Sequence, residues 1–214
     1  ADLESASGES DAAIADYEAA LAVGKPLADS NLKVRQYQAT CAGIFMNYAE
    51  LLAKLDRVED AISRYDDARS KLTLLVERYP KDIEYRIDLC AVHASLGRLY
   101  LWLERPDDAA MPLQAAMKVV DGFVPSESSE RAKWVRSVSQ FHAGRHVWAT
   151  VDASEAVKLL ASAYDSISQL AGEFPEDARY SAQHNDTAIE LHAAQLAAAG
   201  STGALAVGST AIRL

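Results

Sequence analysis

A short pattern of small and large residues recurs along this chain at a nearly constant interval. Each copy has an alanine, a large apolar residue four positions later and a second alanine three positions after that. The clear copies begin at Ala13, Ala61, Ala109 and Ala156, at intervals of 48, 48 and 47 residues, and a weaker copy begins at Ala204. Periods of about 20 to 50 residues are typical of solenoid proteins, whose units bury their apolar faces only against their neighbours.

The residues upstream of each alanine repeat as well. They read Tyr48-Ala49-x2-Leu52, Leu96-Gly97-x2-Tyr100, Ala143-Gly144-x2-Val147 and Leu191-His192-x2-Gln195. Spacings of three and four residues place such side chains on one face of a helix. Prolines at 26, 80, 125 and 175 separate the units, and proline interrupts or begins helices. Each unit is therefore expected to contain two helices.

This pattern predicts an all-α fold, a right-handed α-solenoid of antiparallel helix hairpins with about nine helices. The expected helices cover residues 9–23, 28–55, 57–79, 82–103, 106–122, 127–150, 153–173, 177–199 and 202–213. We expect one array over residues 1–214, with a half repeat at 9–26 and repeats at about 28–80, 81–125, 126–175 and 176–214. Asp56 and Asp152, each followed by a Glu three positions later, are expected to cap second helices. Because residues 9–23 resemble a second helix without its first, we expect a longer natural protein that extends upstream of Ala1.

The charge balance disfavours two classes of partner. Asp and Glu number 31 against 21 Lys and Arg, the net charge is −10, and no basic run occurs. Nucleic-acid binding needs a concentrated positive face that neutralises phosphates, and anionic membrane surfaces need the same. No stretch approaches the roughly 20 apolar residues of a membrane helix. We therefore expect neither a nucleic acid nor a membrane as partner.

Few residues suggest catalytic or metal chemistry. Cys41 and Cys90 lie inside apolar helical patterns and are expected to be buried thiols, with a disulfide or a zinc site as the alternatives. His142 and His146 share a helix face at a spacing that suits a metal, but the Glu of the H-E-x-x-H motif is missing. No nucleophile elbow, P-loop or dinucleotide motif occurs. The sequence therefore predicts no catalytic residue, no metal and no cofactor. A small-ligand sensor or metal-dependent enzyme centred on His142 and His146 is the alternative.

The third unit carries a family resemblance. Leu96-Gly97-x2-Tyr100, followed by Arg105-Pro106-Asp107-Asp108-Ala109, resembles the core signature of the tetratricopeptide repeat. The resemblance covers nearly the whole chain, is strongest in this unit and is weak in the last. Tetratricopeptide repeats have about 34 residues, so repeats of 48 imply helices longer by about two turns each.

A narrower resemblance concerns residues 75–97. The phrase Leu75-Val76-Glu77-Arg78-Tyr79-Pro80, with Glu84-Tyr85-Arg86, His93 and Leu96-Gly97 after it, is similar to long repeats beside bacterial eukaryotic-like Ser/Thr protein kinases. Those arrays are taken to recruit partners or substrates. The chain contains none of the kinase motifs. The resemblance thus implies a protein–protein interaction scaffold, the non-catalytic region of a bacterial signalling protein, and not an enzyme.

The same resemblance implies where a partner would bind. First helices of tetratricopeptide arrays line a concave groove, and the matching positions here are Met46, Glu50, Lys54, Ala94, Arg98, Leu101, Trp102, Phe141, Arg145, Trp148, Ile189, Ala193 and Leu196. We expect a protein or peptide to be held by Trp102 and Trp148, with Arg98 and Arg145 reading an acidic group. The alternative is that both tryptophans pack between adjacent helices. Glu50 and Ala94 stand where the family's carboxylate clamp needs Lys and Asn, so that mode is not expected.

A further possibility is self-association. Open-ended solenoids expose apolar ends, and the last residues of this chain include apolar side chains. These are Ala204, Leu205, Val207, Ile212 and Leu214.

Overall fold

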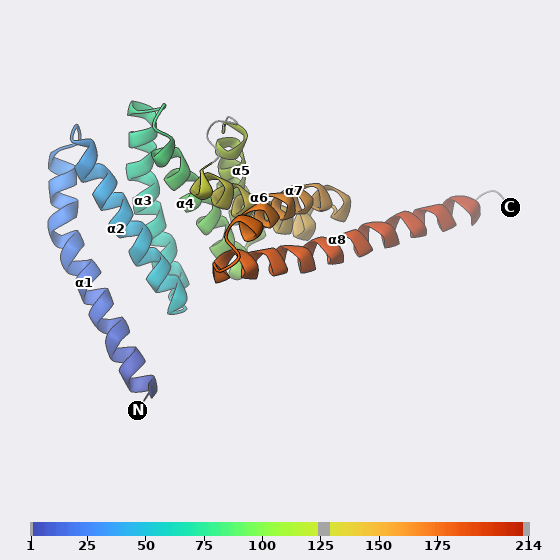
Figure 1. Ribbon diagram of the computed structural model, residues 1–214, viewed down its shortest axis with the longest axis horizontal. Helices are drawn as coiled ribbons and strands as arrows, with labels where there is room; N and C mark the ends of the chain where they lie inside the picture. Colours follow the sequence, from blue (N-terminus) through green and yellow to red (C-terminus); the bar gives the residue numbers. More distant parts are fainter. Residues whose placement is uncertain (1, 124–128, 212–214) are drawn as a thin grey trace. The chain divides into compact units, whose positions relative to one another are not determined.

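The described part of the chain is entirely helical in its regular structure. The computed structural model describes the backbone of residues 2–123 and 129–211, and the side chains of residues 10–123 and 129–200. Within these ranges there are eight helices and no strand (Figure 1). They are α1 (Asp2–Ser30), α2 (Arg35–Lys54), α3 (Val58–Arg78), α4 (Ile83–Trp102), α5 (Pro106–Asp121), α6 (Glu130–Thr150), α7 (Ala153–Glu173) and α8 (Ala178–Ala211).

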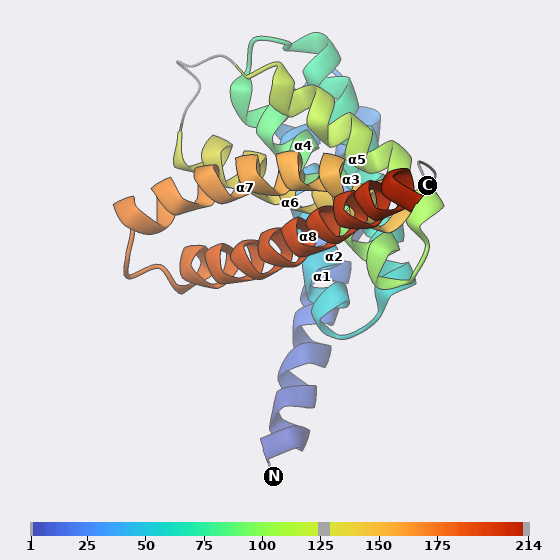
Figure 2. The same cartoon turned by 90° about the vertical axis from the view of Figure 1, so that its right-hand side faces the viewer.

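The chain forms two compact units, unit 1 (Ala1–Leu99) and unit 2 (Tyr100–Leu214). In unit 1, α2 packs against both α1 and α3, and the three helices lie side by side (Figure 1). In unit 2, α6 packs against α5 and α7, and α7 packs against α8 (Figure 2). Consecutive helices thus form antiparallel hairpins, as the repeat predicted for an all-α solenoid. None of the described helices is long and apolar enough to cross a membrane.

The repeating alanines are buried in the packing between helices. Ala61, Ala109 and Ala156 are all fully buried, as are the second alanines of their copies. In α7 the buried positions are Ala156, Leu160, Ala163, Ile167 and Leu170, a spacing of three and four that gives a single apolar face. Small residues let the helix backbones approach, and the large residues between them fill the remaining space.

Polar contacts between α6 and α7 supplement this packing. The hydroxyl of Ser137 donates to the carbonyl of Ala163 at 3.1 Å, and the amide of Gln140 donates to the hydroxyl of Ser162 at 2.9 Å. Ser137 is fully buried, so its hydrogen bond avoids the cost of an unpaired polar group. These bonds specify the register of the two helices.

The prediction of a helix break near Pro26 is wrong. Residues 2–30 form one helix with Pro26 inside it, and the first connection lies between Ser30 and Arg35. The turn after the proline is stabilised by contacts with the rest of unit 1: the carbonyl of Ala28 accepts from Gln38 at 2.5 Å, and Asp29 pairs with Lys71 of α3. These contacts offset the lost backbone hydrogen bond of an interior proline.

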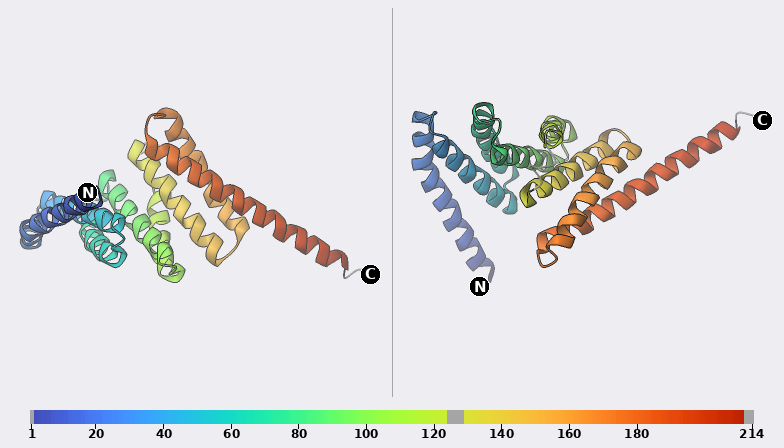
Figure 3. Two further views of the ribbon diagram at one scale, coloured as in Figure 1. Left: turned by 90° about the horizontal axis from the view of Figure 1, so that it is seen from below. Right: turned by 45° about the horizontal axis from the view of Figure 1, so that its top comes forward.

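Two other local predictions need correction. Residues 177–199 and 202–213 were expected as separate helices, but α8 continues through Gly200, Gly203 and Gly208 to Ala211. Each glycine weakens a helix by only about 1 kcal/mol and does not by itself end it. Figure 3 shows α8 extending past the end of its hairpin with α7. Asp56 does not cap α3: it has a φ of 58°, in the left-handed region. Asp152 does cap α7, accepting from the amide of Ser154 at 3.0 Å.

Candidate partner-binding surface

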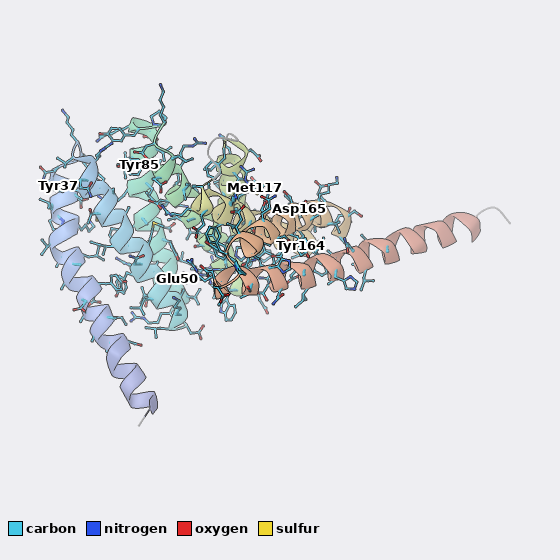
Figure 4. All side chains as sticks on the ribbon, viewed as in Figure 1. Tyr37, Glu50, Tyr85, Met117, Tyr164 and Asp165 are labelled. Atoms are coloured by element: carbon cyan, nitrogen blue, oxygen red, sulfur yellow. The ribbon has the colours of Figure 1, made fainter. Side chains whose placement is uncertain are left out.

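In unit 1 the predicted surface residues gather around one carboxylate. Glu50, near the C-terminal end of α2 (Figure 4), accepts a hydrogen bond from the hydroxyl of Tyr65 at 3.0 Å. The guanidinium of Arg98 approaches the same oxygen at 3.4 Å, and the Nζ atom of Lys54 lies 3.8 Å from the other oxygen. We name these four residues the Glu50 cluster. It places two cations beside one anion and therefore carries one net positive charge.

Burial has a measurable effect on one member of this cluster. Tyr65 is 3% exposed, and its burial, reinforced by the negative charge of Glu50, raises the pKa of its hydroxyl to about 12. The phenol is thus protonated throughout the physiological range and acts as a donor. Arg98 and Lys54 remain partly exposed, with side-chain exposures of 37% and 70%.

In unit 2 the structure brings Arg145 and Trp148 together. They line an open pocket of about 250 Å³ with Ala149 of the same helix and Glu190 of α8. The Nε atom of Arg145 lies 3.3 Å from a carboxylate oxygen of Glu190. We name this the Arg145 pocket. Trp148 is half-buried, because one side of it packs against the core residues of α6 and α7.

The remaining predicted residues are distributed differently. Phe141 was expected on the partner-facing surface, but it is 6% exposed and belongs to the core with Leu160 and Ala163. The centre of its ring lies 5.8 Å from the Arg145 guanidinium, which packs over the ring. Met46 is half-buried, whereas Trp102 is 70% exposed. Ile189 and Leu196 of α8 are also exposed.

The sequence prediction did not anticipate the acidic partners of the two arginines. Glu50 was placed on the surface without a role, and Glu190 was not considered. A signal was present: Glu50 and Arg98 are 48 residues apart, and Arg145 and Glu190 are 45 apart, close to one repeat in each case. Opposite charges at about one repeat interval on first helices indicate an ion pair between neighbouring helices.

The two histidines of the alternative hypothesis have different surroundings. His142 is 5% exposed and meets the ring of Phe141 edge-on, with centroids 5.2 Å apart. His146 is half-buried, and its Nε2 atom donates to the carbonyl of Pro106 at 3.0 Å. Cys41 and Cys90 are buried thiols, as predicted, and burial raises the pKa of the Cys41 thiol.

The proposed self-association residues fall at the end of the chain. Ala204, Leu205, Val207, Ile212 and Leu214 have side chains outside the described residues.

Comparisons with known proteins give the following result. No protein-family model matches the sequence, and no curated protein matches it. Among solved structures it is similar to the crystal structure of BtubC (BKLC) from P. vanneervenii, with 13% sequence identity and a TM-score of 0.47. The match covers 88% of this chain and 75% of that chain. A similarity of this degree carries no inference about function.

Proposed function

We propose that this protein is a scaffold that binds a protein or peptide partner on its first helices. The observation that carries the proposal is the Arg145 pocket, where a half-buried Trp and an accessible Arg line one open depression. Trp supplies a large rigid apolar surface and Arg a planar fork of donors, and both are enriched among residues that dominate interface energies. The tetratricopeptide resemblance, including its kinase-associated variant, supports the same function.

The ion pairs at these arginines suit an acidic partner. The Arg145 and Glu190 side chains are 43% and 29% exposed, and such pairs stabilise a protein by about 0.2–1 kcal/mol. A carboxylate of the partner therefore replaces Glu190 beside Arg145, and the free energy lost with the original ion pair is small. In unit 1 the net positive charge of the Glu50 cluster attracts the same kind of group, whereas the whole chain carries −10 and repels other acidic surfaces.

The proposal is tested by selecting peptides from a random display library on the wild-type protein and measuring their affinity for variants. Arg145→Ala and Trp102→Ala are expected to weaken the selected peptides about tenfold or more each, a loss of about 1.4 kcal/mol. Met111→Ala is the matched control, because Met111 is 79% exposed but lies on the second helix α5. Selected peptides that bind all three folded variants as tightly as the wild type contradict the proposal.

A further inference from the structure

A groove at equivalent positions of the repeat occurs in both units, but different residues line it. In unit 1 a pocket of about 330 Å³ is lined by Glu18 and Leu21 of α1, Tyr48 and Leu52 of α2, and Arg64 of α3, among others. Adding two repeats, 95 or 96 residues, converts these five positions to Gln114, Met117, Ala143, Val147 and Leu159. All five line a pocket of about 450 Å³ in unit 2, over α6 and between α5 and α7.

The decisive difference is at one position of this groove. In unit 1 it is Tyr48, whose ring stacks on Tyr17 with centroids 5.4 Å apart and planes 14° apart. Its hydroxyl donates to Glu18 at 3.2 Å, and the side chain is 6% exposed. In unit 2 the equivalent residue is Ala143, and Leu113 replaces Tyr17. Unit 2 therefore lacks the aromatic ring that fills this place in unit 1, and its pocket is larger.

The lining of the unit 2 pocket specifies the chemistry of an occupant. Most of it is apolar, contributed by Ala110, Leu113, Met117, Ala143, Val147, Val151 and Leu159. Lys118 and Asp121 carry opposite charges, which favours an uncharged ligand. Gln114 stands at the position of Glu18, which accepts the Tyr48 hydroxyl in unit 1. His146, whose Nε2 atom lies 3.0 Å from the carbonyl oxygen of Pro106, is a further polar residue of the lining.

We propose that this pocket binds a small, uncharged aromatic molecule of the phenol class. Its ring takes the place that the Tyr48 ring occupies in unit 1, and its hydroxyl meets the polar groups at Gln114 and His146. A volume of about 450 Å³ is within the usual range of small-molecule sites, about 300–1,000 Å³. This site is separate from the Arg145 pocket and does not depend on the proposed scaffold function.

The test uses 4-methylphenol, the analogue of a tyrosine side chain, and protein labelled with ¹³C in its methionine methyl groups. The chain has three methionines, and only Met117 (labelled in Figure 4) lines the pocket. Titration is expected to shift the Met117 methyl resonance saturably, with a dissociation constant of roughly 5 mM or less. The resonances of Met46 and of the exposed Met111 are internal controls and should not move.

Two variants make this test specific. Ala143→Tyr restores the ring of unit 1 and is expected to weaken binding at least about tenfold, whereas Ala197→Tyr, at an exposed position of α8, should leave it unchanged. If Ala143→Tyr does not fold, Ala110→Phe fills the pocket from α5 instead. No saturable shift at Met117, equal shifts at all three methionines, or full binding by a folded pocket-filling variant would each overturn the proposal.

Discussion

Gly144 of α6 lies directly against the side chain of Leu160 of α7. A Cβ atom at Gly144 would lie 2.8 Å from Cγ of Leu160, a side chain that is fully buried. Such a separation is well inside van der Waals contact. The glycine of this repeat is therefore required by packing and not by backbone conformation.

Gly144→Ala is accordingly expected to destabilise unit 2. Overpacking of this kind costs about 1–3 kcal/mol, and the better helix propensity of Ala returns only about 1 kcal/mol. Gly172→Ala is the control, because Gly172 lies in α7 and a methyl group added there would have no neighbour within 4 Å. Urea denaturation should show a loss of stability for the first variant and a gain of about 0.5–1 kcal/mol for the second. Equal effects would contradict this explanation.

Trp102 and Trp148 are expected to differ in their effect on stability. Trp102→Ala should change the free energy of unfolding by less than about 0.5 kcal/mol, because the side chain is 70% exposed. Trp148→Ala should cost about 1–3 kcal/mol, because its ring packs on the core of α6 and α7. Urea denaturation of both variants measures the difference. If Trp102→Ala proves the more destabilising, that side chain is buried in solution.

Asp29 is expected to stabilise unit 1 by pairing with the buried Lys71. Asp29→Asn leaves that ammonium without its carboxylate and should cost about 1–3 kcal/mol. Lys25→Gln is the control: its pair with Asp29, at 2.7 Å, is exposed to solvent, so its removal should have a much smaller effect. Thermal or urea unfolding of the two variants separates these contributions.

This stabilisation should also depend on pH. Hydrogen bonds from Lys25 and Lys71 lower the pKa of Asp29 below its ordinary 3.8. The folded state thus holds the charged form more strongly, so the contribution is present above pH 3.8 and is lost as the pH falls through the lowered pKa. The stability difference between wild type and Asp29→Asn should therefore narrow in acid. A difference that widens there would refute the ion-pair explanation.

His93 should make the protein less stable in mild acid. Burial, with a smaller effect from Arg69, lowers its pKa from 6.5 to about 4, and its Nδ1 atom has no hydrogen-bond partner. As the pH falls below 6.5, His93 becomes protonated in the unfolded chain but stays neutral in the folded chain. The free energy of unfolding therefore falls. Relative to His93→Gln, the wild type should lose about 2 kcal/mol between about pH 7.5 and pH 5 in urea denaturation.

The repeat was sufficient to predict most of the fold. Residues 153–173 were predicted as a helix and form α7 with those bounds, because its apolar spacing and its Asp152 cap are both local signals. The prediction at Pro26 was wrong because the signals that decide the structure there are not local. The contacts that stabilise α1 beyond it come from residues outside the helix, Gln38 of α2 and the more distant Lys71 of α3.

The candidate site was less predictable than the fold. Helical spacing predicted Arg145 and Trp148 on one face of a helix, and both line one pocket in the structure. The same spacing predicted Phe141 on the surface, but this side chain is buried. A side chain at the border between two faces is buried or exposed according to the size of its neighbours on the next helix. Here Ala156 and Ala163 are small, and the Phe141 ring packs into the space beside them.

The shared acceptor of Tyr65 and Arg98 has a consequence for how ligands can be detected. One carboxylate oxygen of Glu50 accepts from the buried Tyr65 and also from the partly exposed Arg98. We expect a ligand that pairs with Arg98 to alter the hydrogen bond between Glu50 and the Tyr65 phenol, and with it the ultraviolet absorption of that ring. Binding at Arg98 should therefore be detectable at Tyr65, a buried residue that the ligand itself does not contact.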